Sequence, residues 1–288
     1  MLPPPRSGGI HNCSSRQPEL VQDHDPQDQV SVGNAWYTDD QFEKQYSRPG
    51  PRAVIENRWK IFQSEIEDYL AHPDSGNSPE PVRILDAGCG DGINLLGLSN
   101  MIQAKRWNMR IYGADYNALR VDRASKLPCV AEVKVSPLDS LPYPDGHFHV
   151  VLCNQVLEHI PKDRNVLMEL KRVLGPGGML ILGVPNEGCV LAWLRNHVLQ
   201  RSILRTTDHV NFYTSKTLSE LLSHAGYSVR RVVPTGFFVP HLMMHYALSY
   251  FSPSRWLLRM LGKGFPSQAA EIIAIATFDG VFAGKNPP

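Results

Sequence analysis

Residues 84–92, with the sequence Ile-Leu-Asp-Ala-Gly-Cys-Gly-Asp-Gly, constrain the fold more than any other segment of the chain. A short apolar stretch at 82–86 has the length of a buried strand and ends in an acid. Three alternate glycines follow, and glycine lets a backbone turn sharply and approach a ligand closely. In open α/β sheets, ligands bind beyond the carboxyl ends of the strands. The segment predicts a strand–turn–helix unit with a ligand site, and a tight turn without a ligand is the competing interpretation.

Apolar segments of strand length alternate with amphipathic segments along the chain. The expected strands lie at 82–86, 110–115, 132–136, 149–154, 179–184, 228–233 and 270–278. The expected helices between them lie at 93–101, 118–127, 163–174, 186–200 and 214–225. This alternation is typical of βαβ units. It predicts an α/β fold with a doubly wound, mostly parallel seven-stranded sheet whose faces are both covered by helices.

The regions outside this alternation suggest the domain organisation. Residues 1–34 are rich in proline and polar side chains and have no apolar core, so we expect a disordered N-terminal arm. Residues 35–80 predict an N-terminal helical cap of two helices, broken at Pro49-Gly50-Pro51, with the second helix at 52–71. The main domain is expected at 81–288, with a helical lid insertion at 236–264.

Polar residues follow several of the expected strands. Asp115 ends the strand after the glycines, where a carboxylate can accept hydrogen bonds from both hydroxyls of a ribose. Asp139 follows the third strand, and Asn154 and Gln155 end the fourth. A single acid in such a place is more often a helix cap or a solvated loop charge. Together, in this order, these residues predict one ligand site along one edge of the sheet.

At this point the sequence resembles the class I S-adenosylmethionine-dependent methyltransferases of the small-molecule branch (methyltransferase type 11-like), and it is similar to the ubiquinone-pathway O-methyltransferases. The resemblance covers about residues 80–235. It is carried by the motifs ILDAGCGDG (84–92), GADYN (113–117), PLDSLPYPDGHFHVVLCNQVLEHI (137–160), RVLGPGGMLILGVPN (172–186) and HVNFYTSKTLSELLSHAGY (209–227).

The resemblance implies a Rossmann-like fold and S-adenosyl-L-methionine as the cofactor. It implies that Asp115 binds the ribose, that Leu138 and Asp139 bind the adenine, and that Asn154 and Gln155 lie beside the sulfonium. The methionine end would be lined by Asp86, Gly88 and Gly90. Cys89 and Tyr116, next to these residues in the motifs, complete the expected cofactor-binding set.

Two histidines are candidates for a catalytic base. His159 follows Glu158 just after the fourth strand, and His209 precedes a late helix. For each, the competing interpretation is a histidine that bridges loops or caps a helix. The similar ubiquinone-pathway enzymes carry S-E-x-x-E-H here, a set that can hold a divalent metal. In this chain Gln155 replaces the first acid and carries no charge, so we expect no metal site.

The insertion at 236–264 is apolar and aromatic, and it predicts either a wall of the acceptor pocket or simply core. Within it Arg255, Arg259 and Lys263 recur every four residues beside Trp256 and other apolar residues. A basic stripe next to an apolar face occurs in surface helices docked on their own protein. It is also typical of helices that lie on anionic membrane surfaces.

Composition narrows the function further. A formal net charge of +1 gives no overall field that would recruit nucleic acid. Five scattered cysteines without metal or redox spacing favour reduced thiols, so we expect a cytoplasmic protein, either free or peripheral to a membrane. The predicted function is methyl transfer, on oxygen, to a small, partly apolar or lipid-linked acceptor. A nicotinamide-dependent oxidoreductase is one alternative, which the G-x-G-x-G spacing disfavours. A non-catalytic cofactor-binding module is another.

Overall fold

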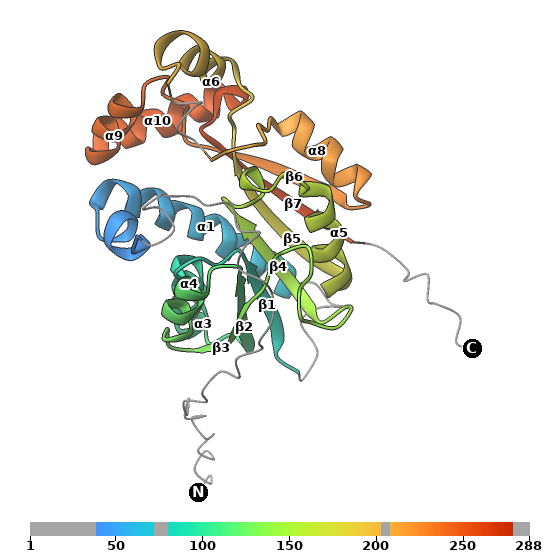
Figure 1. Cartoon of the computed structure of the whole chain (residues 1–288). Coiled ribbons are helices and arrows are strands. Elements are labelled where there is room, and N and C mark those ends of the chain that lie inside the picture. The colour runs from blue at the N-terminus through green and yellow to red at the C-terminus, as the bar shows by residue number, and fades with distance from the viewer. Residues whose placement is uncertain (1–38, 72–79, 203–207, 279–288) are drawn as a thin grey trace, which may run out of the picture. The chain divides into compact units, whose positions relative to one another are not determined.

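The computed structural model describes residues 39–71, 80–202 and 208–278 (Figure 1). The arm expected at 1–34 lies outside the described residues, and so do the ends of the expected cap. Seven strands form one sheet in the order β3-β2-β1-β4-β5-β7-β6. They are β1 (Val82–Ala87), β2 (Met109–Asp115), β3 (Val130–Val135), β4 (Phe148–Asn154), β5 (Leu174–Pro185), β6 (Ser228–Thr235) and β7 (Glu271–Thr277). The predicted α/β fold with a seven-stranded, mostly parallel sheet is confirmed.

The strand order locates the place where a ligand can bind. β1 pairs in parallel with both β2 and β4, so the chain winds outward in opposite directions from this pair. The crevice beyond the carboxyl ends of strands at such a switch point is where open α/β sheets bind ligands. β7 differs from the rest, because it inserts between β5 and β6 and is antiparallel to both.

Helices cover both faces of the sheet, which explains why the central strands are mostly apolar and mostly buried. On one face lie α1 (Pro49–Ala71), α3 (Ile93–Lys105) and α4 (Ala118–Ser125), and on the other lie α5 (Asp163–Val173) and α8 (Ser215–His224) (Figure 1). The helices on each face pack their apolar side chains into one hydrophobic cluster of the core. α8 begins where Thr214 forms a capping box with Thr217.

The N-terminal helices differ from the expectation. Pro49-Gly50-Pro51 forms the first turn of α1 and does not break a helix, because a proline in the first turn has no helical N–H to lose. The preceding helix is reduced to the short π-helix η3 (Phe42–Tyr46). α1 packs on α3 through Trp59, whose indole lies directly over Gly97.

Replacing Gly97 by alanine tests this packing. Alanine favours a helix over glycine by about 1 kcal/mol, but here its Cβ would collide with the Trp59 indole. We therefore expect a loss of about 1–3 kcal/mol in the free energy of unfolding, as for other overpacked sites, measured by urea titration. A Trp59→Leu background should remove most of this loss. A stabilised Gly97→Ala protein would show that the contact is absent.

The remaining helices lie beyond β5 and β6. The single helix expected at 186–200 is divided into α6 (Val190–Leu194) and the π-helix η5 (Arg195–Leu199), and it starts later because Cys189 is its N-cap. The insertion between β6 and β7 contains α9 (Leu242–Tyr250), α10 (Ser252–Gly264) and the short η6 (Pro266–Gln268). Among the described helices, none has the length and apolarity that crossing a bilayer requires.

Candidate functional site

The glycine turn after β1 has a backbone that other residues rarely adopt. Gly88, Gly90 and Gly92 have φ angles of 80°, 54° and 94°. A side chain at Gly88 would collide with Val156, and one at Gly90 would collide with the Gln41 side chain. Cys89 is buried beneath the turn, and burial raises the pKa of its thiol, so it remains protonated and inert. The turn therefore brings bare backbone to the carboxyl end of β1.

Asp86 is the last residue but one of β1, just before the glycine turn, and is 1% exposed. Neither of its carboxylate oxygens has a hydrogen-bond partner of normal geometry among the described residues. Burial, and next the charge of Asp115, raise the pKa of Asp86 to about 8. A buried carboxylate without a partner is costly, so this position suits a cationic ligand group.

Asp115 at the end of β2 joins the second strand to the glycine turn. It accepts hydrogen bonds from the backbone N–H of Gly90 at 2.9 Å and of Asn117 at 2.9 Å. These bonds fix the carboxylate, while each oxygen keeps a further lone pair for a ligand hydroxyl. Burial raises the pKa of Asp115. Tyr116, the next residue, is half exposed beside it.

A segment from the N-terminal side closes over the turn. The backbone N–H of Gln41 donates to Asp91 at 2.6 Å, and the Asp91 N–H donates to the Gln41 side chain at 3.2 Å. Arg123 of α4 contacts the same carboxylate at 3.4 Å. This contact was not predicted, because Gln41 matches no part of the cofactor motifs.

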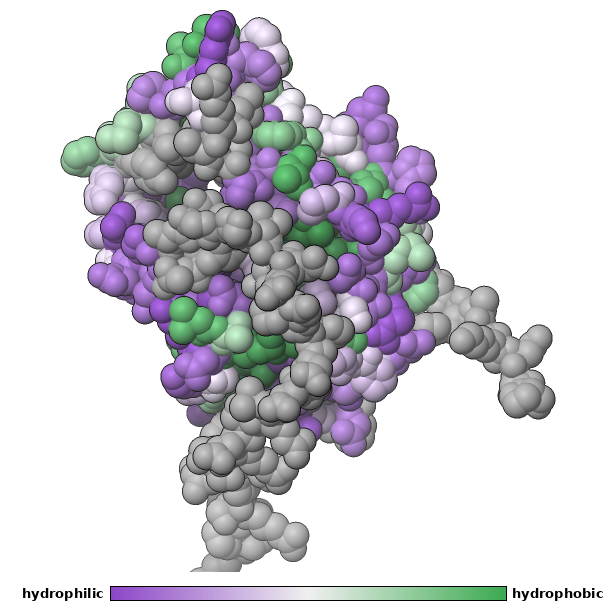
Figure 2. Space-filling view, viewed as in Figure 1, coloured by the Kyte–Doolittle hydropathy of each residue, from purple (hydrophilic) through white to green (hydrophobic). Residues whose placement is uncertain are grey.

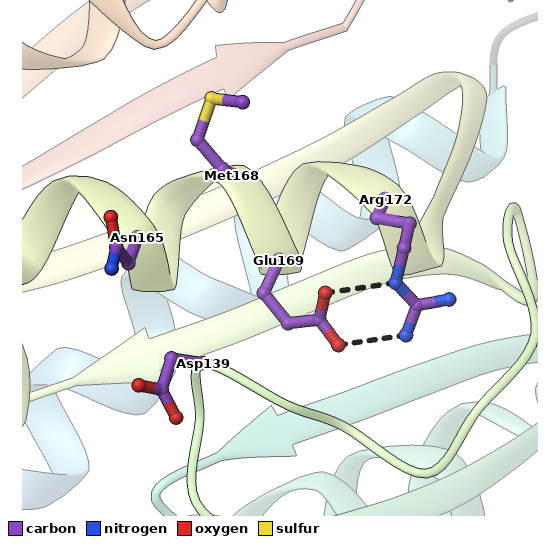
Figure 3. A pocket seen from close by; sticks show the side chains of 5 residues that line it. All are labelled: Asp139, Asn165, Met168, Glu169 and Arg172. Carbon is purple, nitrogen blue, oxygen red and sulfur yellow. Dashed lines mark hydrogen bonds and ion pairs between the residues drawn. The ribbon is translucent and has the colours of Figure 1, made fainter.

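The residues expected at the adenine end lie after β3. Leu138 is buried, whereas Asp139 is exposed at the edge of a shallow cavity of about 460 Å³. Figure 3 shows Asp139 opposite α5, from which Asn165, Met168, Glu169 and Arg172 line the rest of that cavity. Glu169 and Arg172 pair there at 2.7 and 2.8 Å. A role of Asp139 in binding adenine stays a prediction.

Asn154 and Gln155 form the end of β4. Asn154 is buried, its Oδ1 has no partner among the described residues, and it lies so close to Gly183 that a side chain there would collide with it. Gln155 has a φ of 59°, which is uncommon for a residue other than glycine. Residues with such a backbone conformation are found most often at functional sites. Its Nε2 donates to Glu271 of β7 at 3.0 Å. Glu271 in turn lies 2.8 Å from Arg58 of α1, an ion pair that no motif indicated.

The structure brings the two candidate histidines together. The short 3₁₀ helix η4 (Leu157–His159) follows β4, and the N–H groups of Val210 and Asn211 both donate to the Glu158 carbonyl, at 2.8 and 3.1 Å. As a result the rings of His159 and His209 are 4.8 Å apart. The Glu158 side chain is 1% exposed, and burial raises its pKa to about 7.

Each histidine has a carboxylate partner. His209 Nδ1 lies 2.7 Å from Glu187 Oε2, and Arg195 contacts the other oxygen of Glu187 at 2.6 Å. Burial opposes ionisation of Glu187, but His209 and Arg195 outweigh it and lower its pKa. His159 Nδ1 lies 3.3 Å from Asp208 Oδ2. Burial disfavours the charged form of His159, yet Asp208 and Glu158 raise its pKa overall.

The same cluster has the chemistry of a metal site. Glu158, His159 and His209 each offer a ligand atom, and these atoms lie within 4.8 Å of one another. Imidazole and carboxylate ligands suit zinc and other divalent ions. The expectation of no metal rests on Gln155, which supplies an amide where the similar enzymes supply an acid, and it stays a prediction.

Comparisons with known proteins agree with this geometry. A family model described as a methyltransferase domain matches residues 56–232. A probable S-adenosylmethionine-dependent methyltransferase of Mycolicibacterium smegmatis is 28% identical over 62% of this chain and 63% of its own length. The 2-methyl-6-phytyl-1,4-hydroquinone methyltransferase of Synechocystis is 29% identical over 63% of this chain and 58% of its own. The matches therefore span less than two thirds of these relatives.

Among solved structures, the DszA carbon methyltransferase superposes with a TM-score of 0.57. The superposition covers 85% of this chain and 61% of the DszA chain, and the two sequences are 17% identical. At this level of identity the likeness supports the fold alone. The family expected from the glycine turn and the strand-end residues is confirmed, since the family model covers more than half of the chain. The chain belongs to the methyltransferase-domain family, with the class I S-adenosylmethionine-dependent fold.

Proposed function

We propose that this protein transfers a methyl group from S-adenosylmethionine to an oxygen atom of a small, partly apolar or lipid-linked acceptor. The single observation that carries the proposal is the convergence of two sets of residues at the carboxyl ends of the central strands. One set is the glycine turn with Asp86 and Asp115. The other is the cluster in which Glu187 holds His209 at 2.7 Å.

The residues beside the glycine turn fit the cofactor. Asp86 is a buried carboxyl group whose oxygens have no hydrogen bond of normal geometry within the described part of the chain, and the Asn94 side chain offsets its burial only in part. This position suits the ammonium of a methionyl group. Asp115 is fixed by two backbone N–H groups and has lone pairs for two ribose hydroxyls. Leu138 offers an apolar surface to an adenine ring. Asn154 and Gln155 add uncharged polar groups at the end of β4, beside which a sulfonium can lie.

S-adenosylmethionine supplies a methyl group already activated on a sulfonium, so methyl transfer disperses positive charge and needs no oxyanion hole. What the chain must contribute is alignment, exclusion of water and, for a hydroxyl acceptor, a base. When the N–H at Nδ1 of His209 donates to Glu187, the lone pair lies on Nε2, which then accepts the proton of the hydroxyl. Arg195 keeps Glu187 ionised and in place.

His159 is the weaker candidate for the base. Its two ring nitrogens lie near two carboxylates, Asp208 at 3.3 Å and Glu158 at 3.9 Å, which together favour the charged form that cannot accept a proton. The preference for an apolar acceptor rests on the aromatic and methionine-rich lid. It is supported by the relative named for a phytyl-hydroquinone.

Calorimetric titration with S-adenosylhomocysteine, beside NADH, tests the cofactor. We expect S-adenosylhomocysteine alone to bind. We expect Asp115→Ala to weaken its binding about 100-fold or more, because two hydrogen bonds to a charged group are lost. Asp122→Ala, an exposed acid on α4, is the matched control and should bind normally. Binding of NADH instead would favour the oxidoreductase alternative. Binding without transfer of labelled methyl to any of a panel of phenols and lipid-linked acceptors would favour the non-catalytic module.

A further inference from the structure

Two long segments of the chain, one of which contains the lid insertion at 236–264, carry no acidic residue. The chain has 28 aspartates and glutamates, yet none falls in residues 188–207 or in residues 221–270. These segments include all of α6, η5, α9 and α10, and they do contain arginines and a lysine. The protein is nearly neutral as a whole, whereas these two segments have a positive formal charge because they lack acidic residues.

α10 turns apolar side chains to both the protein and the solvent. On its inner side Leu258 and Leu261 are partly buried, and Gly262 lies so close to the backbone of Gly236 that no side chain would fit. On its outer side Trp256 is 59% exposed and Met260, one turn further, is 46% exposed. The helix is thus docked on its own protein and still leaves a second apolar face uncovered.

Basic side chains border the uncovered face of α10. Arg259 and Lys263 are both exposed, one turn apart, and neither pairs with a carboxylate of the described residues. Arg255 has a different role. It donates to the carbonyls of Ser249 and Tyr250 at 2.8 and 2.9 Å, and so it fixes the end of α9 against the start of α10.

Other exposed apolar residues lie on the segments next to α10. The lid face is defined here as the exposed apolar residues of this region together with Arg259 and Lys263. Its apolar members are Met243, Met244, Tyr250, Phe251, Trp256, Leu257, Met260 and Phe265. Figure 2 shows apolar atoms reaching the surface over α9 and near α6, the part of the molecule that stands apart from the sheet in Figure 1. Monomeric soluble proteins rarely expose large apolar patches, and such patches usually mark a site of interaction.

We propose that the lid face binds the surface of a membrane that contains anionic phospholipids. Its aromatic and methionine side chains suit the boundary between headgroups and acyl chains, and its basic border suits anionic headgroups. A second copy of the chain would bring the same positive charge to the same face and would be repelled. This inference goes beyond the proposed function, because it depends on neither the cofactor nor the acceptor.

Sedimentation with vesicles tests the proposal on the full chain. The probes are vesicles of phosphatidylcholine alone and vesicles of phosphatidylcholine mixed equally with phosphatidylglycerol. We expect binding to the mixed vesicles, weakened by added salt. The double variant Arg259→Glu, Lys263→Glu should bind about thirtyfold or more weakly, because each basic residue contributes about fivefold near such a surface. Trp256→Ser with Met260→Ser should lose binding as well.

Matched variants separate the lid face from general surface effects. Lys126→Glu with Lys216→Glu reverses two exposed lysines, one at the C-cap of α4 and one on α8. This variant should bind vesicles like the unchanged protein, and all variants should keep their affinity for S-adenosylhomocysteine, which shows that they are folded. The proposal is overturned if mixed vesicles are not bound, if the lid variants bind them normally, or if light scattering finds a dimer that Trp256→Ser with Met260→Ser dissolves.

Discussion

Replacing Asp86 by asparagine is expected to weaken the binding of S-adenosylhomocysteine about 100-fold and, at the same time, to stabilise the free protein at high pH. Asparagine has nearly the same shape but no charge for a ligand ammonium, and a lost ion pair in a buried site costs this much. In the free protein, however, the carboxylate has no partner of normal geometry among the described residues, so its charge only opposes folding. Calorimetry measures the first effect, and urea unfolding measures the second.

The pH dependence of the second effect follows from the pKa of Asp86. Burial raises this pKa from 3.8 to about 8, so between these values the folded protein holds a proton that the unfolded chain has released. The stability that comes from this proton is complete below about pH 4 and is lost as the pH rises toward 8. One pKa unit corresponds to about 1.4 kcal/mol, so the loss amounts to several kcal/mol.

Asp86→Asn has no such proton to lose. Its free energy of unfolding should therefore rise above that of the unchanged protein progressively between pH 4 and pH 8. Asp139→Asn, an exposed acid on another loop, serves as the control and should follow the unchanged protein. Parallel pH profiles for Asp86→Asn and the unchanged protein would contradict the burial of a charged carboxylate at this position.

Replacing His209 by alanine is expected to lower the turnover of a hydroxyl acceptor by about 10²–10⁴, the range for loss of a general base. The affinity for S-adenosylhomocysteine should not change, since in our proposal His209 contacts the acceptor and not the cofactor. Glu187→Gln should also lower turnover, because an amide can donate to Nδ1 and so hold the wrong tautomer of the imidazole. Transfer of labelled methyl and calorimetry measure the two quantities.

Two other histidine variants complete this test. His197→Ala removes an exposed histidine of η5 and should leave turnover unchanged. His159→Ala should lower turnover less than tenfold if the ring only supports the cluster. A large loss in His159→Ala with a small one in His209→Ala would assign the base to His159. Normal turnover in both would show that the acceptor needs no histidine.

Local sequence was sufficient to locate the strands along the chain, but not to predict which strands pair with each other in the sheet. β1 and β4 are buried on both faces, so most of their residues are apolar, and these short apolar segments are visible in the sequence. The position of β7 between β5 and β6 depends on long-range pairing, which no local pattern encodes. β5 begins at Leu174, earlier than the expected residue 179, because the segment Gly175-Pro176-Gly177-Gly178 continues the strand after Leu174 has paired with Phe148.

The site shows the same division. Asp86 and Asp115 follow strands, so motif spacing was enough to bring them to one edge of the sheet. The contact between His159 and His209 depends on backbone hydrogen bonds between η4 and a segment about fifty residues away. The sequence showed only that His159 follows a strand and that His209 precedes a helix. Glu187, Arg195, Arg58 and Glu271 were missed. They are single charged residues in a turn, at the start of η5, within α1 and at the start of β7, where a charge in the sequence usually indicates only exposure to solvent.

The central place of β7 has a consequence for synthesis on the ribosome. β6 is an edge strand whose only partner in the sheet is β7, and the apolar lid lies between the two in the chain. While the lid is being made, β5 has an open edge and β6 has no strand to pair with, although α9 and α10 can already contact α1 and β6. Unpaired strand edges and exposed apolar surface promote aggregation in nascent chains. The sheet therefore closes in one late step, when residues 271–277 emerge, and a ribosome that stalls before that step leaves a nascent chain dependent on chaperones.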